Sequence, residues 1–415
     1  MTLAVISHPS KQGNMYRIPA GAERAGFETA FLTGYYWRGP GLGLRLLHAM
    51  RPATAERVTK LLRRRQLSDL DPKLVRRISG PMPEALYRVA GYPAGNWVHD
   101  RLASLWLTRH VPRGTRGVFH GFQESCASSL LTAQRRGLST VLEITLPPST
   151  NPIVAREQRR LGIEPAAAEP SPAFLQELKR TQYVVAQSRF SATSAMEYGV
   201  PAGRIFQVPL GVDTDRFRPA PDDASGSRPF RALFTGQMTV RKGVHHLLQA
   251  WSTLARGEDE LLFAGYPSER YVLDLVARTT GRHRYLGFVP HERLQEVYWQ
   301  ADIFVFPSLA EGGVYVIYEA LACGLPCIVS ENAGSAVRDG IEGFVVPPGD
   351  VDALADRIRR LREDETLRRR MGVAARKRSE MFSWPEFYRR IGLLYREILD
   401  RNGNAGAEAM NFFER

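Results

Sequence analysis

Two acidic residues with seven residues between them, Glu311 and Glu319, have the type and spacing to hold a sugar. The apolar run 303–306 before them is typical of a buried strand, because its hydrophobic residues are continuous and a proline follows. Residues 314–323 have a helical pattern, and a glycine and a proline come just after them. This arrangement predicts that Glu311 lies in the strand-to-helix loop and Glu319 inside the helix.

The start of the predicted helix favours a phosphate group. Gly312 and Gly313 let backbone N–H groups approach a ligand closely. The unpaired N–H groups near Val314 and Tyr315, together with the helix dipole, attract an anion. Carboxylates on both sides suit sugar hydroxyls, which donate hydrogen bonds to them. We therefore predict a site for a phosphate-linked sugar. The alternative, which these residues alone leave open, is that one acid is an ordinary surface residue and the other an ordinary helix residue.

A second loop carries two neighbouring cations. The apolar run 231–235 leads to Gly236, and Arg241 and Lys242 follow before a predicted helix at 244–251. Cations in such a loop neutralise the negative charge of a diphosphate leaving group. The alternative is a turn whose arginine and lysine only face solvent.

The stretch from Pro307 to Pro326 resembles the signature of a known enzyme family. Pro-Ser-x-x-Glu-Gly, a second glutamate after seven residues, and Glu-Ala-x-Ala-Cys-Gly-x-Pro closely resemble glycosyltransferase family 4. The resemblance implies the α/β GT-B fold, in which two Rossmann-like, doubly wound domains face each other across a cleft. It also implies a retaining, nucleotide-sugar-dependent transferase, in which Glu311 contacts the donor sugar and Glu319 holds the ribose hydroxyls.

The same resemblance extends to three other loops. Residues 236–243 are similar to the family's Gly-x-x-x-x-x-Lys-Gly loop. Many members have arginine where this chain has Gln237, so we infer that Arg241 supplies the second positive charge. Val289 lies in a stretch that resembles the loop whose backbone meets the nucleotide base. Gly13 lies where the family has a glycine-containing loop over the reaction centre, although a glycine pair is missing here.

His120 closes the apolar run 118–120 in the first half of the chain. A residue at the carboxyl end of a strand in an open α/β sheet faces the crevice where ligands bind, and the family often has a histidine near the donor sugar. A packed or surface histidine is the alternative. Glu143 has a similar position, and contact with the acceptor or the donor is one interpretation of it, beside an ordinary structural role. The expected catalytic residues are Glu311, His120, Lys242 and Arg241, and the expected donor-binding residues are Glu319, Gly236, Gly312, Gly313, Val314, Tyr315, Val289 and Gly13.

No metal or other cofactor is expected, because the nucleotide-diphosphate sugar is itself the substrate. Asp213-Thr214-Asp215 fits an Asp-x-Asp metal-binding pattern, but it lies in a stretch that resembles the family's interdomain turn, where such acids are structural. Cys323 and Cys327 lack a second ligand pair for zinc.

The length of 415 residues is sufficient for two domains. Short apolar runs alternate with helical patterns, which is typical of βαβ units and parallel sheets. The polar stretch 219–227 has the composition of a linker. We expect an acceptor-side domain at 1–210, a nucleotide-sugar domain at 211–384 and a flexible tail at 401–415. The resemblance implies that a helix at about 386–400 packs back on the first domain. The expected strands are 2–6, 118–120, 139–144, 183–186 and 205–208, then 231–235, 261–264, 285–286, 303–306, 327–329 and 344–346.

The composition restricts location and partners. No run is apolar and long enough to span a bilayer, and no segment has the pattern of a secretory leader. Three cysteines form no disulfide framework, which fits a cytoplasmic protein. The net charge of +13 is concentrated between Arg45 and Arg77, where ten cations face three acids. With interleaved leucines, this segment fits an anionic membrane surface at the inner face of the membrane. An ordinary solvated face is the alternative, and nucleic acid is disfavoured because no reader motif is present.

The expected function is transfer of a sugar from a nucleotide-diphosphate sugar to a hydroxyl of a glycan or glycolipid, in cell-envelope or exopolysaccharide synthesis. A nucleotide-sugar epimerase or a phosphorylase on the same fold is the enzymatic alternative. A non-catalytic carbohydrate-binding scaffold is the other alternative. The joint presence of the glutamate pair and the arginine–lysine pair favours the transferase.

Overall fold

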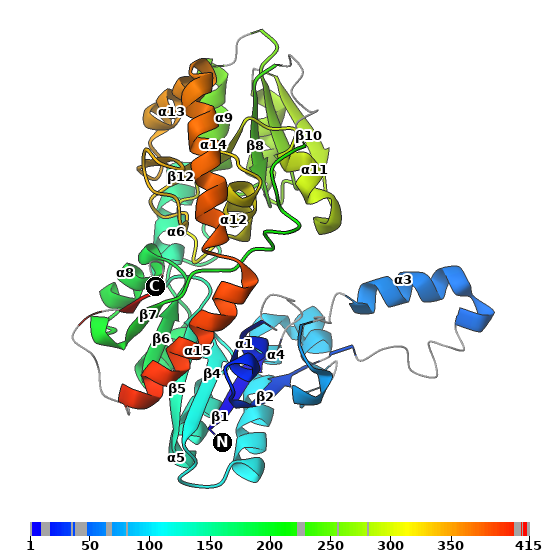
Figure 1. The fold of residues 1–415 in the computed structure, drawn as a ribbon, viewed down its shortest axis with the longest axis vertical. Coiled ribbons are helices and arrows are strands. Elements are labelled where there is room, and N and C mark those ends of the chain that lie inside the picture. The colour runs from blue at the N-terminus through cyan, green and yellow to red at the C-terminus, as the bar shows by residue number, and fades with distance from the viewer. Residues whose placement is uncertain are drawn as a thin grey trace.

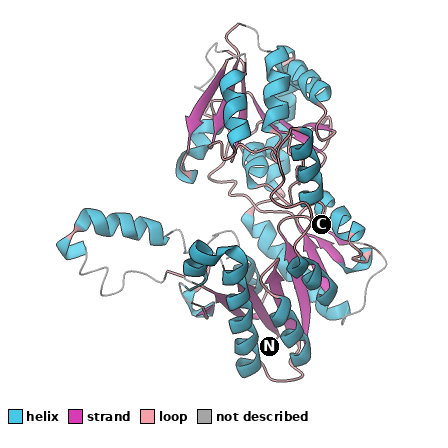
Figure 2. Ribbon diagram, turned by 180° about the vertical axis from the view of Figure 1, so that it is seen from behind, coloured by secondary structure: helices cyan, strands magenta, loops and turns pink. Residues whose placement is uncertain are grey.

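The chain forms two parallel β-sheets with helices on both faces of each (Figures 1 and 2). This computed structural model describes residues 2–9, 17–34, 36–37, 48–63, 69–79, 82–221, 229–254, 257–279, 282–401, 408 and 410–412. Most of the predicted linker therefore lies outside the described residues. The two sheets confirm the predicted α/β class.

The first sheet has the strand order β14-β7-β6-β5-β4-β1-β2-β3. Every strand pair recorded in it is parallel. Its strands are β1 (Leu3–His8), β2 (Glu28–Thr33), β3 (Val75–Arg77), β4 (Gly117–Phe122), β5 (Leu138–Ile144), β6 (Tyr183–Ala186), β7 (Ile205–Gln207) and β14 (Met410–Asn411).

The second sheet has the order β10-β9-β8-β11-β12-β13 and is also parallel. Its strands follow the apolar runs seen in the sequence, because helices on both faces require both sides of each strand to be apolar. The strands are β8 (Arg231–Thr235), β9 (Glu260–Ala264), β10 (His283–Gly287), β11 (Ile303–Phe306), β12 (Cys327–Ser330) and β13 (Gly343–Val346).

Each sheet has a point where the chain order changes direction, between β4 and β1 in the first and between β8 and β11 in the second. In the second sheet, Ile303 pairs with Ala232 and Phe304 with Leu233, so the carboxyl ends of β8 and β11 lie level. Open α/β sheets bind ligands at such positions. The loops that begin at Gly236 and at Pro307 are therefore brought together by the topology.

The described helices cover the sheets in both domains, with α9, α13 and α14 beside the second sheet in Figure 1. The helical region 351–380 is divided at Asp364, whose side chain accepts a hydrogen bond from the N–H of Leu367 and so caps a new helix. The helices are α1 (Arg17–Arg24), α3 (Pro52–Arg63), α4 (Met82–His110), α5 (Ala127–Arg136), α6 (Thr150–Arg160), α7 (Pro172–Arg180), α8 (Arg189–Glu197), α9 (Val244–Leu254), α10 (Arg270–Arg278), α11 (Leu294–Tyr298), α12 (Tyr315–Ala322), α13 (Val351–Glu363), α14 (Glu365–Glu380) and α15 (Trp384–Arg401). None of these described helices is apolar over a length that would cross a bilayer.

Helix α15 runs from the second domain along the first one (Figure 1). Its buried face, including Ile391 and Tyr395, belongs to the hydrophobic core on one side of the first sheet. A Cβ on Gly392 would lie 2.6 Å from the Cβ of Ala25, so this approach of α15 to the first domain requires a glycine.

The end of the chain differs from the expected flexible tail of residues 401–415. Met410–Asn411 form strand β14 against the edge strand β7, and the Phe412 side chain is buried with its ring 6.4 Å from that of Phe206. An unpaired strand edge and one apolar residue are enough to hold this short segment. Residues 402–407 lie outside the described part of the chain.

Candidate active site

The loops after β8 and β11 are packed directly against each other. The N–H of Leu309 donates to the carbonyl of Arg241 at 2.8 Å. Gly243 has a φ of +68°, and a Cβ there would lie 2.0 Å from the carbonyl oxygen of Pro307. Only glycine fits this left-handed conformation at such a close approach. This contact holds the two cations of the first loop beside the acid of the second.

The carboxylate of Glu311 forms ion pairs with both of those cations. Its Oε2 lies 2.5 Å from Nη1 of Arg241, and its Oε1 lies 3.1 Å from Nζ of Lys242. Glu311 is only 7% exposed, so the three charges meet where water screens them little. Burial lowers the pKa of Lys242, and the carboxylate of Glu311 opposes that shift. Two cations and one carboxylate leave a net positive charge at this point, which suits an anionic ligand.

Glu319 lies inside α12, as the pattern predicts, and its carboxylate is also engaged. Its Oε1 lies 2.8 Å from Nε2 of His291, and its Oε2 accepts a hydrogen bond from the Tyr298 hydroxyl at 3.0 Å. Burial, followed by the charge of Glu319, raises the pKa of Tyr298 well above its ordinary value, so this hydroxyl keeps its proton. Sequence reasoning missed both partners, because neither belongs to a local pattern.

The predicted glycine pair at the start of α12 contacts the first domain. A Cβ on Gly312 would lie 2.3 Å from the carbonyl oxygen of Thr145, and one on Gly313 would lie 2.9 Å from the Cβ of Gln187. The Ser191 hydroxyl donates to the carbonyl of Gly312 at 3.3 Å. The glycines therefore allow the two domains to approach each other, a role that the sequence did not indicate.

The helix that follows has no side-chain cap. Val314 is the N-cap residue of α12, and its side chain makes no capping hydrogen bond. The N-cap residue therefore gives the first N–H groups of the helix no side-chain acceptor. The ring of Tyr315 lies 6.2 Å from that of Trp384, at the point where α15 begins. The uncapped end suits an anion, in agreement with the predicted phosphate position.

The other predicted donor-binding residues lie in the loops around the second sheet. Gly236 follows β8 with a φ of +124°, and a Cβ there would lie 3.9 Å from the side chain of Lys242. Val289 is half-buried against the core of the second domain, two residues after Gly287. Gly13 lies outside the described residues.

His120 is fully buried in the first domain. Its Nε2 lies 3.1 Å from Oε2 of Glu143, and its Nδ1 lies 2.9 Å from the hydroxyl of Tyr395 on α15. The other carboxylate oxygen of Glu143 accepts a hydrogen bond from the Gln187 amide at 2.9 Å. The side chain of Gln187 also lies beside Gly313, where an added Cβ would be 2.9 Å from it, so the hydrogen-bonded group of His120, Glu143 and Gln187 reaches the start of α12. The structure thus joins His120 to the site through Gln187, which the sequence did not indicate.

A cavity of about 690 Å³ lies between the domains next to the Glu311 loop. Arg189 and Phe190 line it from the first domain, and Asn332 lines it from the second. The carbonyl of Asn332 accepts a hydrogen bond from the N–H of Glu311 at 2.9 Å.

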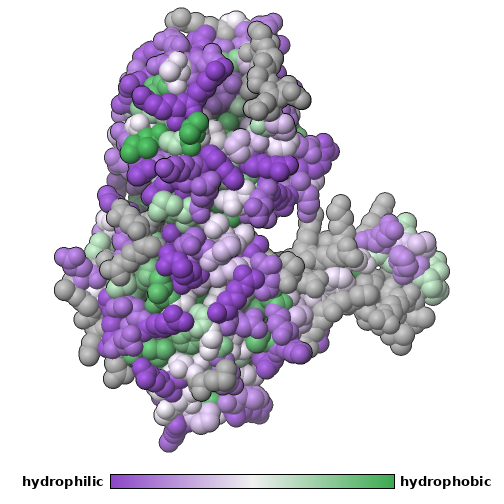
Figure 3. All heavy atoms as spheres, in the orientation of Figure 1, coloured by the Kyte–Doolittle hydropathy of each residue, from purple (hydrophilic) through white to green (hydrophobic). Residues whose placement is uncertain are grey.

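Two further sequence predictions concern Asp213 and the basic segment. Asp213 accepts a hydrogen bond from the N–H of Arg216 at 3.0 Å, a local turn contact. Helix α3 stands away from the two sheets in the ribbon and space-filling views (Figures 1 and 3). Within the basic segment, Arg51, Lys73, Arg76 and Arg77 are exposed, whereas Arg45, Arg64 and Arg65 lie outside the described residues.

The family comparison matches the part of the chain that contains the loops after β8 and β11. Residues 220–378 match the family model of glycosyl transferases group 1. The chain is 31% identical over 222 residues to the O-antigen chain mannosyltransferase B of Escherichia coli, covering 50% of this chain and 58% of that protein. It is 34% identical over 225 residues to a D-inositol 3-phosphate glycosyltransferase of Xylanimonas cellulosilytica, covering 49% and 54%. The chain thus spans about half the length of the curated relatives it matches.

Solved structures match nearly the whole chain. Sucrose-phosphate synthase from Thermosynechococcus elongatus superimposes with a TM-score of 0.68 at 18% identity, covering 96% of this chain and 100% of that one. Anabaena HepE in complex with UDP-glucose has a TM-score of 0.62 at 16% identity, covering 95% and 99%. At these identities the likeness concerns the fold, and it confirms the predicted GT-B architecture.

Proposed function

Because residues 220–378 of this chain match the family model of glycosyl transferases group 1, we propose that the protein transfers a sugar from a nucleotide-diphosphate sugar to an acceptor hydroxyl. One observation carries the proposal. Arg241 and Lys242 converge on the buried carboxylate of Glu311 at the carboxyl ends of β8 and β11. Cations aimed at one point are what a departing diphosphate requires, since its negative charge grows as the glycosidic bond breaks.

In the proposed donor complex, the diphosphate lies between the two cations and the uncapped start of α12. The sugar is then next to Glu311, whose oxygens accept hydrogen bonds from its hydroxyls. The ribose hydroxyls donate to Glu319, which is already held in place by His291 and Tyr298. Each carboxylate oxygen has a second lone pair, so these contacts add to the existing ones.

We propose that the transfer retains the configuration of the sugar and uses no metal. Arg241 and Lys242 take the place that a divalent cation has in other transferases. The oxygen of the acceptor hydroxyl attacks the sugar on the face from which the diphosphate leaves. The departing phosphate oxygen takes the proton of that hydroxyl. His120 is expected to act close to the donor sugar, and its buried link through Glu143 and Gln187 to Gly313 supports this role.

The acceptor is proposed to be a glycan or glycolipid of the cell envelope or an exopolysaccharide. Among the relatives, one is named for an O-antigen chain and another is a GDP-mannose-dependent phosphatidylinositol monomannoside mannosyltransferase of Mycolicibacterium smegmatis, with 30% identity. With such an acceptor, the protein is proposed to act at the inner face of a membrane, and the basic segment from Arg45 to Arg77 is the surface proposed to contact it.

The experiment is a thermal-shift panel of nucleoside diphosphates, followed by assays with the matching nucleotide sugars. A bound ligand raises the melting temperature by mass action, so one diphosphate should stand out. Sugar transfer to an added acceptor supports the proposal. Turnover of the nucleotide sugar without an acceptor indicates an epimerase instead, and binding without any turnover indicates a carbohydrate-binding scaffold.

A further inference from the structure

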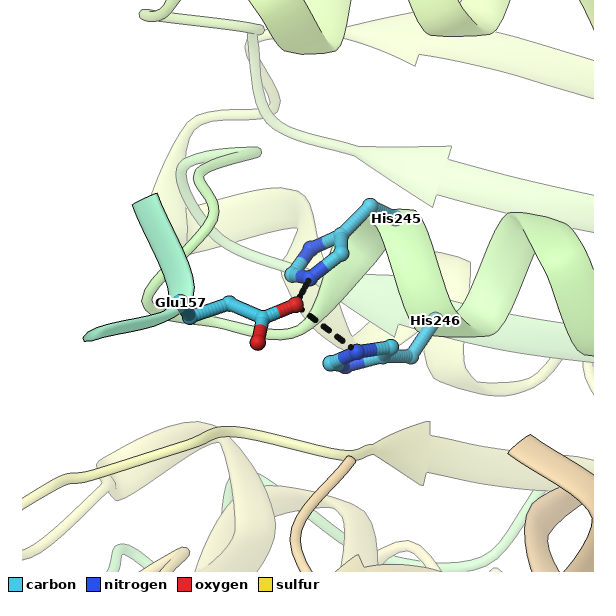
Figure 4. A group of neighbouring side chains, drawn as sticks. All are labelled: Glu157, His245 and His246. Carbon is cyan, nitrogen blue, oxygen red and sulfur yellow. Dashed lines mark hydrogen bonds and ion pairs between the residues drawn. The ribbon is translucent and has the colours of Figure 1, made fainter. Parts of the chain in front are cut away.

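Helices α6 and α9 meet in a group of three ionisable side chains. Glu157 belongs to α6, in the first domain, and His245 and His246 belong to the first turn of α9, in the second. Oε1 of Glu157 lies 2.9 Å from Nε2 of His245 and 3.2 Å from Nε2 of His246 (Figure 4). Two imidazoles from one domain thus converge on a single carboxylate oxygen from the other.

These side chains are shielded from water. His245 is 5% exposed and His246 2%. Nδ1 of each histidine is buried with no hydrogen-bond partner among the described groups. The polar contacts of both rings are therefore made by Nε2, and the two Nε2 atoms are turned toward the same carboxylate oxygen.

We propose that Glu157, His245 and His246 form a binding site for a divalent transition metal ion, with Zn²⁺ as the best-fitting ion. Their ligand atoms all lie within 4.8 Å of one another. Zn²⁺ binds imidazole nitrogen and carboxylate oxygen at about 2.0–2.2 Å, often with three protein ligands and one water molecule. Small side-chain rotations bring all three atoms to such distances, and the carboxylate and neutral imidazoles are the forms that coordinate the ion.

The position of the group gives the metal a structural role. His245 follows Lys242 by three residues. Helix α6 packs on the core of the second domain through Ile153, and its C-cap residue Leu161 does the same. A metal held by both helices fixes the first domain against the helix that begins directly after the cationic loop. This site goes beyond the proposed transfer reaction, which it does not enter.

Arg160 competes with a metal for the same carboxylate. Its Nη2 lies 3.0 Å from Oε1 of Glu157 and 3.5 Å from Nε2 of His246. Its side chain is 66% exposed, so it can turn into solvent when a metal binds. Removing this charge should strengthen metal binding, because a like charge next to a cation site opposes binding.

The test is calorimetric titration of Zn²⁺ into the full chain without a polyhistidine tag, after dialysis against a chelator. The unchanged chain should bind one ion per molecule. Glu157→Gln and His246→Ala should each weaken binding by tenfold or more, since even outer-shell changes at metal sites cost about 10–100-fold. Arg160→Met should bind more tightly, and His110→Ala, an exposed histidine on α4, should bind unchanged.

Glu157→Gln keeps the size of the side chain, so it serves where an alanine variant does not fold. Absence of Zn²⁺ binding by the unchanged chain would overturn the proposal and leave the group as a hydrogen-bonded contact between domains. Equal binding by the unchanged chain and by folded Glu157→Gln would also overturn it. Neither result bears on nucleotide-sugar transfer, which is measured separately.

Discussion

Nζ of Lys242 lies 3.1 Å from Oε1 of Glu311, with each residue in the loop that follows one of two adjacent strands. The lysine side chain is 14% exposed and is held in this ion pair. A positive group held in this way needs little reorganisation when negative charge develops beside it. The pairing of β8 with β11 in the second sheet therefore places the lysine where the proposed chemistry requires a positive charge.

Replacing Lys242 by methionine should reduce kcat/KM for sugar transfer by an amount equivalent to about 2–4 kcal/mol, the usual cost of losing one charged contact to a transition state. Methionine keeps an unbranched apolar side chain and removes the charged Nζ, which lies 4.8 Å from the centroid of the Phe306 ring. Steady-state kinetics measure the effect. The matched control is Lys377→Met, an exposed lysine on α14, which should have unchanged kinetics.

The same lysine predicts a pH dependence of diphosphate binding. Burial lowers its pKa below the ordinary 10.5. The charged form binds the diphosphate, so affinity should fall as pH rises through this lowered pKa, earlier than for an exposed lysine. Lys242→Arg keeps its charge throughout this range and should flatten the fall. Titration of the nucleoside diphosphate at several alkaline pH values tests this, and an identical fall in Lys242→Arg would assign it to another group.

The strands were largely predictable and the contacts between loops were not. Apolar runs such as 303–306 indicated buried parallel strands, because both faces of each strand are covered. Strand β3 is Val-Arg-Arg and has no such run. Glu311 and Glu319 were found from their motif. Their partners His291 and Tyr298 come from a separate loop and helix, so no local spacing relates them to the glutamates.

The contact that the glycine pair makes between the domains could also not be predicted from the sequence. Flexibility near a ligand and close approach of another backbone both favour glycine, and the sequence does not distinguish them. The structure shows the approach, since the carbonyl of Thr145 occupies the space beside Gly312.

Gly312→Ala should push the domains apart or strain their contact. The added Cβ would lie 2.3 Å from the Thr145 carbonyl oxygen, and overpacking of this kind costs about 1–3 kcal/mol. We expect a lower melting temperature or a larger radius of gyration in solution X-ray scattering. Ser191→Ala removes only a hydroxyl that donates to Gly312 and should have a smaller effect. An unchanged melting temperature and radius in Gly312→Ala would mean that the domains do not meet there in solution.

Sugar transfer should persist in excess chelator. Arg241 and Lys242 supply the positive charge for the diphosphate, and a Zn²⁺ ion at Glu157 would hold the domains without contacting the donor. The assay compares transfer rates before and after dialysis against chelator. Activity that vanishes and returns with Mg²⁺ or Mn²⁺ would contradict metal independence and redirect attention to Asp213 and Asp215.

The basic segment should bind anionic membranes. Each cation near an anionic surface contributes about 1 kcal/mol, and the attraction should weaken with salt because exposed charges are screened beyond about 10 Å at 0.1 M. Co-sedimentation with anionic liposomes measures it. Reversing Arg63, Arg64 and Arg65 to glutamate should release the protein without changing nucleotide affinity. If the unchanged chain stays in solution at low salt, the segment is a solvated face and a soluble acceptor is favoured.

The central claim is that Glu319 holds the nucleotide and Glu311 the sugar, and calorimetry separates the two roles most directly. Titrate the nucleoside diphosphate selected by the thermal-shift panel, and then its nucleotide sugar, into the unchanged chain, Glu319→Ala and Glu311→Ala. Glu319→Ala should lose about 1.5–3 kcal/mol for both ligands, the value of a hydrogen bond to a charged group. Relative to the unchanged chain, Glu311→Ala should lose more in turnover of the nucleotide sugar than in affinity for the bare diphosphate. Undiminished affinity for the diphosphate and the nucleotide sugar in both variants would contradict the assignment.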